Sequence, residues 1–362
     1  MINMDERERI REKINAVDAR ILEALSERVH LAKEIGQYKK KAGLSIVDAA
    51  RETIVLRKIG EEATRRNLPR EKVEAVYREI IRLCRSVQME QLRVAFLGPR
   101  GTFCEQAARE HFLDDNAVFE ERPSITDVFR SVTVKEVDRG VVPVENSSEG
   151  PVVPTLDLLG ESALKICGEV ITRVRHNLIA RPDAELDDVR EVASHPQALA
   201  QCQRYLDENL PSASLLETRS TADAVRLASE RTGVAAIGTE LAAQIYGMKV
   251  LASGIEDNHE NHTRFFILSW DDHEPTGNDR TSILFSVKHR PGSLCEALSA
   301  FSSRGINLTK IESRPARRGP WEYVFFCDFE GHREDAKIKE ALEELRTKAT
   351  ELKILGSYPI AR

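Results

Sequence analysis

The chain has 362 residues, of which 41% are hydrophobic and 31% are charged, and its formal net charge is −6 at pH 7. That length exceeds one ordinary hydrophobic core and predicts two to three soluble globular domains. A slightly acidic, evenly spread charge argues against nucleic acid as a partner. The sequence shows no signal peptide, no run near the roughly 20 apolar residues of a membrane span, and no metal-ligand spacing among six scattered cysteines. We therefore expect a cytoplasmic protein with reduced thiols, no bound metal and no membrane partner.

Residues 5–42 predict one long helix, because they contain no proline and are rich in strong helix formers. At 1.5 Å per residue it would extend roughly 55 Å, so we expect it to find packing partners. Its apolar positions recur at helical spacing, but two cations, Arg28 and Lys39, interrupt the stripe. Such side chains can lie along an apolar face and reach water. Two of them on one stripe favour a site for an anionic ligand, because an unpaired buried charge is very costly.

Two further helices are expected before residue 90. Gly43 should end the long helix, Asp48 can cap a second helix of about 18 residues, and Pro69 lies near the start of a third. In the third helix Gln88 shares the apolar stripe, and in the second Glu52 shares a face with apolar residues. Polar groups on inward faces are therefore a property of all three helices.

These residues resemble the all-helical chorismate mutase domain that begins the bifunctional enzymes of phenylalanine synthesis, over residues 7–90. The residues that carry the resemblance are Arg11, Arg28, Lys39, Asp48, Arg51, Glu52 and Gln88. In that family two chains interlock through their long first helices. The chemistry agrees, because chorismate carries two carboxylates and its pericyclic rearrangement to prephenate needs only fixed cations and a neutral donor.

The resemblance also implies a role for each residue. Arg11 of the partner chain and Arg28 would bind the carboxylates, with Arg51 adding to the positive field. Lys39 and Gln88 would reach the ether oxygen, and Asp48 with Glu52 would hold the ring hydroxyl. Cys84 stands where that family has a small hydroxyl residue, so we expect it only to line the site. For Arg51 and Glu52 a solvated helix face remains an equally open interpretation.

From Leu92 onward, short apolar strands alternate with helical patterns, which is typical of an α/β domain. Small hydroxyl or amide residues repeatedly mark the turns from strand to helix. Taken singly, Thr102 and Ser220 would be ordinary helix caps. Several in one domain would surround a crevice at the strand ends, where open α/β sheets bind ligands. The loop 98–103 lacks the glycine patterns for phosphate or dinucleotide binding, which disfavours ATP and NAD.

The segments 98–103, 142–147, 194–197, 220–222 and 263–265 together resemble prephenate dehydratase across residues 92–270. That family has two α/β lobes, like periplasmic binding proteins, with the substrate between them. The resemblance implies that Thr263 is catalytic, as a hydrogen-bond donor that orients the leaving hydroxyl. It implies a substrate-binding set of Thr102, Asn146, Ser147, Ser220, Thr221, Arg264 and Phe265, in which Arg264 would stabilise charge or the loop.

Histidines of this region invite two other interpretations. The run from His259 to His262 looks like a zinc motif but is one residue too short, and no third ligand is in view. His195 precedes a proline, and we expect a structural role in that turn rather than general-base catalysis. No metal site is predicted.

After a polar linker at 271–279, strands at 283–287, 306–312, 321–329 and 352–358 alternate with helices at 294–304 and 335–348. This β-α-β-β-α-β order is the ferredoxin-like module. It resembles the amino-acid-sensing ACT domain, with Ser293 and Cys295 departing from the phenylalanine-sensing version. The implied effector site comprises Pro291, Gly292, Ser293, Leu294, Glu312, Ser313, Arg314 and Pro315. A purely structural pairing domain is the alternative.

The sequence thus predicts a multidomain enzyme with a helical domain at 1–90, a two-lobed α/β domain at 92–270 and a ferredoxin-like domain at 281–359. It would convert chorismate to prephenate and prephenate to phenylpyruvate without a cofactor, as a homodimer or larger assembly inhibited by phenylalanine. One alternative is a dehydratase whose helical domain only dimerises. A ligand-binding regulator would need a basic recognition helix, and a prephenate dehydrogenase a dinucleotide motif; neither pattern is present in the sequence.

Overall fold

The structure, a computed structural model, describes residues 4–42, 48–88, 91–113, 115–315 and 323–361. Contacts divide the chain into two compact units, residues 1–92 with 112–117, and residues 93–111 with 118–362. The first unit is built from three helices, α1 (Met4–Lys41), α2 (Ala49–Arg65) and α3 (Arg70–Ser86). None of the helices in the described residues is long and apolar enough to cross a membrane.

The helix boundaries follow the expected capping residues. Asp48 is the N-cap of α2, where its carboxylate accepts the backbone N–H of Arg51 at 2.9 Å, and Pro69 is the N-cap of α3. Both predictions are confirmed. Helix α1 ends at Lys41, while the expected stop at Gly43 lies outside the described residues. Helix α1 lies close to the residues that follow α3 at Gly36, where an added Cβ would lie 2.8 Å from Gln88 Cγ.

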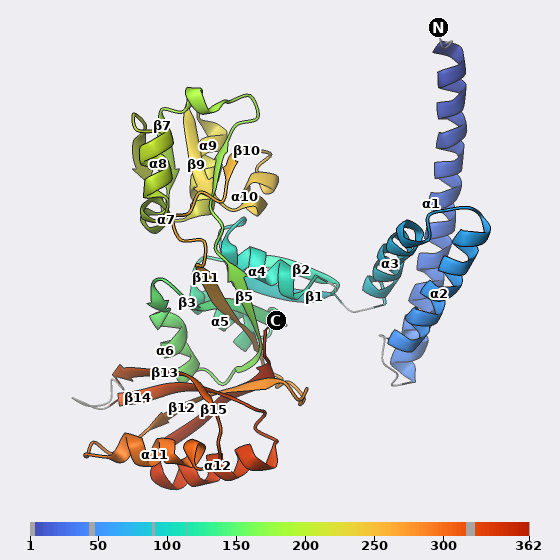
Figure 1. Cartoon of the computed structure of the whole chain (residues 1–362). Helices are drawn as coiled ribbons and strands as arrows, with labels where there is room; N and C mark the ends of the chain where they lie inside the picture. Colours follow the sequence, from blue (N-terminus) through green and yellow to red (C-terminus); the bar gives the residue numbers. More distant parts are fainter. Residues whose placement is uncertain (1–3, 43–47, 89–90, 114, 316–322, 362) are drawn as a thin grey trace. The chain divides into compact units, whose positions relative to one another are not determined.

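The N-terminal half of α1 extends beyond α2 and α3 (Figure 1). Its apolar stripe remains about half exposed, at 53% for Ile10, 54% for Ile14, 49% for Val17 and 52% for Ile21. Farther along the helix, Ala32 is buried and Leu25 is half-buried. Ile35, near the C-terminal end of the stripe, is again 49% exposed, so a single chain leaves most of the stripe uncovered.

The first lobe of the second unit is a mixed sheet in the order β2-β1-β3-β11-β5, from β2 (Ala117–Arg122), β1 (Leu92–Leu97), β3 (Arg139–Asn146), β11 (His262–Ser269) and β5 (Lys165–Arg173). Strands β1 and β3 are parallel, whereas β11 runs antiparallel between β3 and β5. The short strand β4 (Gly150–Pro151) pairs with β3, and α4 (Phe103–His111), α5 (Ile125–Thr133) and α6 (Val153–Glu161) complete the lobe.

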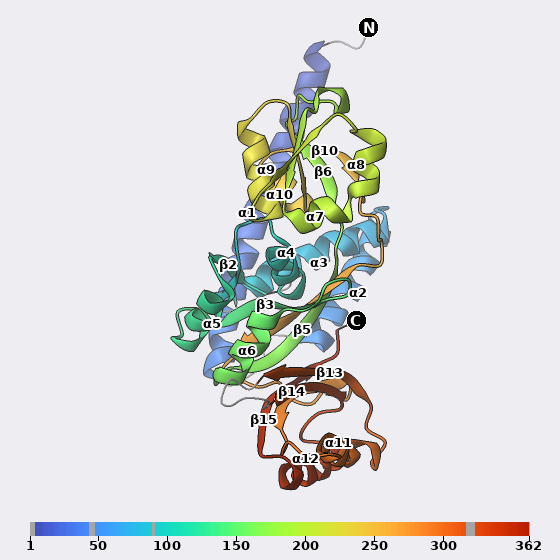
Figure 2. The same cartoon turned by 90° about the vertical axis from the view of Figure 1, so that its left-hand side faces the viewer.

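The second lobe has the strand order β10-β6-β9-β7-β8, from β10 (Lys249–Ser253), β6 (Asn177–Ala180), β9 (Val234–Gly238), β7 (Glu191–Ser194) and β8 (Ser214–Glu217). Its helices are α7 (Pro196–Gln201), α8 (Gln203–Asn209), α9 (Thr221–Glu230) and α10 (Glu240–Ile245), with a 3-10 turn at Leu186–Asp188. Two chain crossings, from β5 to β6 and from β10 to β11, join the lobes (Figure 2). The predicted two-lobed α/β architecture is confirmed.

The C-terminal domain follows the predicted ferredoxin-like order, with β12 (Asp279–Ser286), α11 (Ser293–Ser302), β13 (Leu308–Pro315), β14 (Tyr323–Glu330), α12 (Ala336–Lys348) and β15 (Glu351–Pro359). The sheet order is β13-β14-β12-β15. Strand β13 was expected to end at Glu312 but continues to Pro315; a proline is tolerated there because β13 is an edge strand. Residues 321 and 322 of the expected next strand lie outside the described residues.

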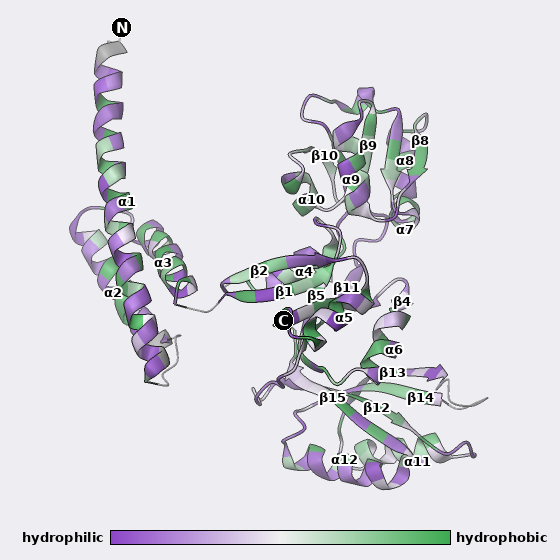
Figure 3. Ribbon diagram, turned by 180° about the vertical axis from the view of Figure 1, so that it is seen from behind, coloured by the Kyte–Doolittle hydropathy of each residue, from purple (hydrophilic) through white to green (hydrophobic). Residues whose placement is uncertain are grey.

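The first lobe and the C-terminal domain share one hydrophobic core. Val142, Ile166 and Phe266 of the lobe pack in the same buried cluster as Phe326 and Tyr358 of the C-terminal domain. The backbones also approach closely, because a Cβ added to Gly356 of β15 would lie 2.0 Å from the carbonyl oxygen of Ile166. Strongly hydrophobic strands at the centre of these sheets are visible as green ribbons in Figure 3. We therefore treat the lobe and the C-terminal domain as one packed body.

Candidate functional site

A cavity of about 830 Å³ opens in the two-lobed domain, with walls from both lobes. It brings together five of the sequence-predicted site residues, which are Thr102, Asn146, Ser220, Thr221 and Thr263. They come from four separate parts of the chain: the β1–α4 turn, the end of β3, the start of α9 and the start of β11. Their convergence on one cavity is the arrangement expected for ligands bound at strand ends of open α/β sheets.

Local hydrogen bonds fix the turns that carry these residues. Ser220 is the N-cap of α9 and accepts the backbone N–H of Asp223 at 3.0 Å. Thr102 donates its hydroxyl to the carbonyl of Leu97 at 3.0 Å, which closes the turn after β1. The same turn is joined to the second lobe, because Thr239 donates to the carbonyl of Gly101 at 2.6 Å. Ordinary capping and a position at the cavity thus coexist in Ser220.

The Thr263 hydroxyl is held from one side by an amide. Asn146 and Thr263 are partners in the β3–β11 ladder, and Asn146 Nδ2 donates to Thr263 Oγ1 at 2.9 Å. Because this oxygen already accepts a hydrogen bond, the hydrogen of the Thr263 hydroxyl is available for another acceptor. A positioned donor of this kind can stabilise an oxygen that leaves with negative charge.

The Asn146 amide belongs to a longer hydrogen-bonded chain across the lobes. Asn146 Nδ2 also donates to Asn261 Oδ1 at 2.9 Å, Asn261 Nδ2 donates to Gln201 Oε1 at 3.4 Å, and His176 Nε2 lies 3.0 Å from that same oxygen. Since Gln201 Oε1 is an acceptor, the hydrogen of a neutral His176 ring is on Nε2. Burial lowers the pKa of His176 below its ordinary value of 6.5, so the ring is neutral at pH 7.

His176 and Gln201 line the cavity, and each has a buried side-chain nitrogen with no hydrogen-bond partner among the described residues. Sequence reasoning missed both residues, as well as the buried Asn261. Gln201 could have been found from the sequence, because it lies one helical turn after Gln197 of the segment 194–197. Both residues line the cavity. His176 carries no comparable signal, since it stands alone in the crossing between β5 and β6.

Ser147 does not line the cavity but supports it. Its hydroxyl donates to Asn261 Oδ1 at 3.3 Å and accepts the backbone N–H of His262 at 2.9 Å. Ser147 is exposed. Its two hydrogen bonds fix the corner between β3 and β11 beside Asn146. We expect an indirect contribution to substrate binding from this residue.

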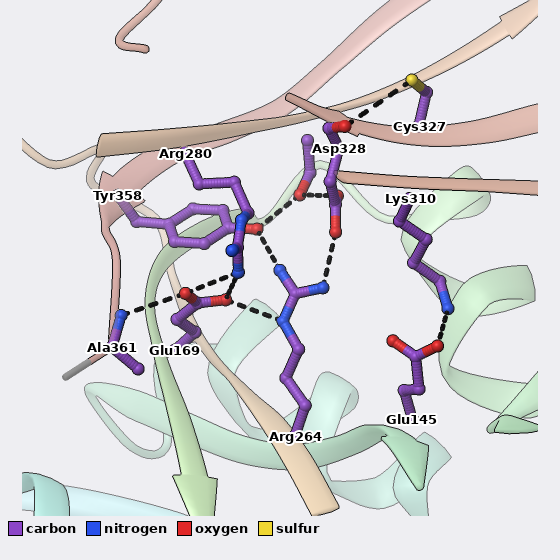
Figure 4. A network of polar contacts seen from close by, with 10 residues as sticks. Glu145, Glu169, Arg264, Arg280, Lys310, Cys327, Asp328, Tyr358 and Ala361 are labelled. Atoms are coloured by element: carbon purple, nitrogen blue, oxygen red, sulfur yellow. Dashed lines mark hydrogen bonds and ion pairs between the residues drawn. The ribbon is translucent and has the colours of Figure 1, made fainter. Parts of the chain in front are cut away.

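Arg264 and Phe265, unlike the five residues above, do not line the cavity. Arg264 follows Thr263 on β11, and successive side chains on a strand point to opposite faces. Its guanidinium binds Glu169 at 2.7 Å and Asp328 at 2.5 Å, on the side of the C-terminal domain (Figure 4). Phe265 is 1% exposed. Both residues thus lie away from the cavity lining, and their contact with substrate stays a prediction.

The histidines occupy the positions expected for structural roles. His195 is the N-cap of α7, where its Nδ1 accepts the backbone N–H of Gln197 at 3.3 Å, and it also lines the cavity. His259 pairs with Glu256 at 3.3 Å, and His262 Nδ1 lies 2.9 Å from the carbonyl of Glu260. Among the described residues, no group of three metal-binding side chains occurs.

The helical unit brings several of its predicted site residues to one surface of α1 and α3. Arg28 is half-buried, and its Nη1 contacts Cys84 Sγ at 2.6 Å and the carbonyl of Ile80 at 3.4 Å. Gln88 folds back on α3 and donates to the carbonyl of Cys84 at 2.9 Å. Lys39, also half-buried, lies one helical turn beyond Gly36, the point where α1 touches Gln88.

Glu52 of α2 has a partner that the sequence did not reveal. Both of its carboxylate oxygens lie 2.7 Å from Arg85 Nη2 on α3, and both side chains are largely buried. The pair is 33 residues apart in the chain, so only the packing of α2 on α3 brings it together. Asp48 and Arg51 are exposed at the start of α2.

Arg11 is far from this group within one chain. It is exposed on α1, 17 residues before Arg28, which corresponds to roughly 25 Å along the helix axis. A site that uses both arginines therefore needs Arg11 from another copy of the chain.

The expected effector segments lie at one end of the C-terminal sheet. Strand register places Arg314 opposite Val324, and Val324 opposite Ser286, which precedes the turn at 290–293. Gly292 has a positive φ of 84° and is the N-cap of α11, while Ser293 is buried. A second cavity, of about 870 Å³, is lined by Arg314 and Pro315 together with α6, where Arg314 pairs with Asp157 at 3.3 Å.

Comparison with known proteins finds three families in succession along the chain. The chain matches the family Chorismate mutase type II over residues 10–89, Prephenate dehydratase over 94–273 and the ACT domain over 281–347. The bifunctional chorismate mutase/prephenate dehydratase of Aquifex aeolicus is 45% identical over 361 residues, covering 99% of both chains. The protein of the same description from Escherichia coli is 31% identical over 371 residues, covering 97% of this chain and 95% of the relative.

Solved structures resemble the second unit. Prephenate dehydratase from Arthrobacter aurescens in complex with L-Phe has a TM-score of 0.69 and 36% identity, covering 74% of this chain and 90% of the other. A structure described as the quorum-quenching acylase GqqA has the same TM-score and 30% identity, covering 74% of this chain and 97% of the other. Because one fold can serve different activities, the site residues and the helical domain must decide between them.

Three domains in this order, with a cavity between two lobes and cations on a helical stripe, define a multifunctional enzyme of aromatic metabolism. The chain belongs to the family of bifunctional chorismate mutase/prephenate dehydratases.

Proposed function

We propose that the chain converts chorismate to prephenate in residues 1–90 and prephenate to phenylpyruvate in residues 92–270, with phenylalanine sensed by residues 281–359. The observation that carries the proposal is the Thr263 hydroxyl at the cavity, whose oxygen accepts from Asn146 and whose hydrogen is free for a leaving group. No cofactor is required by either reaction, and we expect both to proceed in the cytoplasm.

Aromatisation drives the second reaction, in which the ring carboxylate leaves as carbon dioxide while the ring hydroxyl departs. The bond to the carboxylate breaks, its electrons enter the ring, and the carbon–oxygen bond to the hydroxyl breaks at the opposite ring carbon. Thr263 would donate its hydrogen bond to the departing oxygen, where negative charge develops. A threonine hydroxyl is a weak acid at pH 7, so its role is orientation and stabilisation of charge.

Polar groups around the rest of the cavity would hold the substrate. The N-terminus of α9 at Ser220 and Thr221 supplies backbone N–H groups and the positive end of a helix dipole, which favours a carboxylate. The unpartnered nitrogen of Gln201 offers a further hydrogen-bond donor at the wall. Thr102 and Asn146 complete this set from the first lobe.

The first reaction needs no nucleophile, because one carbon–oxygen bond breaks as one carbon–carbon bond forms within a single molecule. Arg28, with Arg11 of a second chain, would bind the two carboxylates and hold the compact conformer. Lys39 and Gln88 would stabilise negative charge on the ether oxygen. Asp48 and Glu52 would hold the ring hydroxyl, with Arg85 fixing the Glu52 carboxylate. Arg51 would add positive field, and Cys84 would line the site.

We propose a homodimer or larger assembly that pairs α1 with its copy. The exposed apolar stripe from Ile10 to Ile21 supports this assembly. Its four large side chains are about half exposed, and packing them against a second chain would remove apolar surface from water, which is favourable. The distance between Arg11 and Arg28 within one helix supports it independently.

Phenylalanine would bind to the C-terminal domain through the segments 291–294 and 312–315. Their common position at one end of the sheet supports this, since Gly292 opens a helix N-terminus and Arg314 supplies a cation. Inhibition would then be a coupling free energy of about 1–3 kcal/mol between this site and the cavity.

The main alternative is a dehydratase whose helical domain serves only dimerisation. Purified protein supplied with chorismate, without added cofactor, decides between the two. We expect chorismate to disappear and phenylpyruvate to form, with prephenate as intermediate. Protein that converts added prephenate but leaves chorismate unchanged would establish the alternative. Protein inactive on both substrates would refute the whole proposal.

A further inference from the structure

Four charged side chains lie where the first lobe meets the C-terminal domain. Lys310 Nζ contacts Glu145 Oε1 at 2.6 Å, and Arg264 Nη1 contacts Asp328 Oδ2 at 2.5 Å (Figure 4). Glu145 and Arg264 come from β3 and β11 of the lobe, whereas Lys310 and Asp328 come from β13 and β14. We call these four residues the charge quartet. Each ion pair joins the two domains.

The quartet follows the strand ladders on both sides. Glu145 and Arg264 are opposite each other in the β3–β11 ladder, and Lys310 and Asp328 are opposite each other in the β13–β14 ladder. Each sheet thus presents one positive and one negative side chain, and each side chain meets its opposite charge across the interface. A slip of one sheet against the other would break both pairs at once, so the quartet specifies one arrangement.

The next ladder pair on the lobe side is the one at the cavity. Asn146 follows Glu145 and Thr263 precedes Arg264, and these two are also opposite each other in the ladder. Because neighbouring residues on a strand point to opposite faces, one face holds the Asn146–Thr263 hydrogen bond and the other holds the quartet. Only one peptide bond separates the two pairs on each strand, so a displacement of Glu145 or Arg264 also moves Asn146 or Thr263.

Arg264 is fixed from several directions, which makes the quartet stiff. Glu169 binds both Arg264 and Arg280 at 2.7 Å, and the Tyr358 hydroxyl accepts from Arg264 Nη2 at 3.0 Å. The carboxylates of Glu169 and Asp328 are fully buried, so each depends on its cationic partner. Lys310 also has little exposure, at 9% of its side chain.

On the other side, Lys310 lies on the strand expected to contact the effector. Glu312 is two residues further along β13 and therefore shares its face with Lys310. A ligand that moves this edge strand would move Lys310, and with it Glu145 and the neighbouring Asn146.

We propose that Lys310 and its partner Glu145 are positioning residues through which the C-terminal domain holds the Asn146–Thr263 hydrogen bond in its productive geometry, and through which phenylalanine inhibits the dehydratase. This inference rests on the function proposed above. Lys310 does not line the cavity; it acts through Glu145 on the alignment of the threonine hydroxyl.

The test is Lys310→Met in the full-length chain, with Lys353→Met as matched control. Lys353 also crosses from the C-terminal domain to the lobe, where it donates to the carbonyls of Leu159, Gly160 and Ser162 at the end of α6. Because Lys353 lines the second cavity beside Arg314, it is the control for dehydratase kinetics and for amide exchange, not for phenylalanine binding. The conservative variant Lys310→Arg should retain wild-type behaviour. Dehydratase kinetics, phenylalanine inhibition and phenylalanine binding by equilibrium dialysis are measured on each protein.

For Lys310→Met we expect kcat on prephenate to fall roughly tenfold with KM changed less than about twofold, because alignment of a donor is lost and binding is not. The phenylalanine concentration for half-inhibition should rise at least about tenfold while direct binding of phenylalanine is kept. Lys353→Met should leave kcat and KM on prephenate unchanged. An equal fall of kcat in both variants, or unchanged inhibition in Lys310→Met, would overturn the proposal.

Hydrogen–deuterium exchange separates this inference from the proposed function. In Lys310→Met, amides in residues 144–147 and 262–266 should exchange faster than in the wild type, and in Lys353→Met they should not. That result does not depend on activity. Wild-type protein without dehydratase activity would refute the proposed function, whereas unchanged exchange in Lys310→Met would refute the positioning role.

Discussion

The two proposed active sites differ in how far one chain completes them. In the two-lobed domain, Thr263 and Asn146 are hydrogen-bonded to each other, and a chain of amides supports them from the second lobe. In the helical domain, Arg28 is half-buried beside Cys84, while Arg11 is exposed on a helix whose apolar stripe is also exposed. One site is preorganised within the chain, and the other is expected to be assembled between chains. Changes in one should therefore leave the other intact.

The largest effect is expected from Lys39→Ala, which should lower chorismate mutase activity by about a thousandfold, since it removes a cation from the developing charge on the ether oxygen. Prephenate dehydratase activity should be unchanged in the same preparation. Lys33→Ala, an exposed lysine on the same helix, is the control. Full mutase activity in Lys39→Ala would favour a helical domain that only dimerises.

Thr263→Ala should lower dehydratase activity by about a hundredfold, as expected for the loss of one well-placed donor. Supplied with chorismate, this variant should accumulate prephenate, and its mutase rate should equal that of the wild type. Thr263→Ser keeps the hydroxyl and should retain most of the activity. Normal formation of phenylpyruvate by Thr263→Ala would remove Thr263 from the mechanism.

A mixture of chains tests the claim that only the helical site is shared. Arg11→Ala and Arg28→Ala should each lack mutase activity alone. After mixing and exchange of subunits, about half of the dimers contain one chain of each kind and one of their two sites is intact, so about a quarter of the wild-type activity should return. An Arg11→Ala protein with full activity, or a mixture that stays inactive, contradicts a site shared between chains.

Much of the fold could be predicted from the sequence, because the elements are long and their signals local. The 38-residue helix α1 follows from uninterrupted helical periodicity, and the Asp48 cap from a residue type at a helix start. Thr102 and Ser220 could be assigned to one cavity because each stands in a turn from a strand to a helix, whereas Thr263 was assigned from the resemblance to prephenate dehydratase.

Contacts between distant segments could not be predicted in this way. Glu52 binds Arg85 only because α2 packs on α3, and His176 meets Gln201 only because two crossings bring the lobes together. The position of Arg264 depends on a strand boundary. Strand β11 begins at His262, and a strand that includes Thr263 places Arg264 on the opposite face.

The smallest effect concerns the preorganised site and its pH dependence. Burial lowers the pKa of His176 in the folded protein, so as pH falls below about 6.5 the unfolded chain takes up this proton before the folded chain does. The stability from a neutral His176 is complete above that pH and is lost progressively below it. Glu256 accepts the backbone N–H of His176. Burial raises the pKa of Glu256, but hydrogen bonds outweigh that effect and hold the pKa below 4.5. Glu256 therefore affects the stability only at a lower pH than His176 does.

His176→Gln should therefore flatten the loss of stability of the two-lobed domain as the pH falls below about 6.5, measured as the urea midpoint of unfolding. His289→Gln, at an exposed position of the C-terminal domain, is the control and should keep the wild-type slope. The mutase domain provides a second comparison, because His176 is not part of it. Mutase activity should therefore follow the same pH profile in His176→Gln and in His289→Gln. A wild-type slope in His176→Gln would mean that another group titrates in this window.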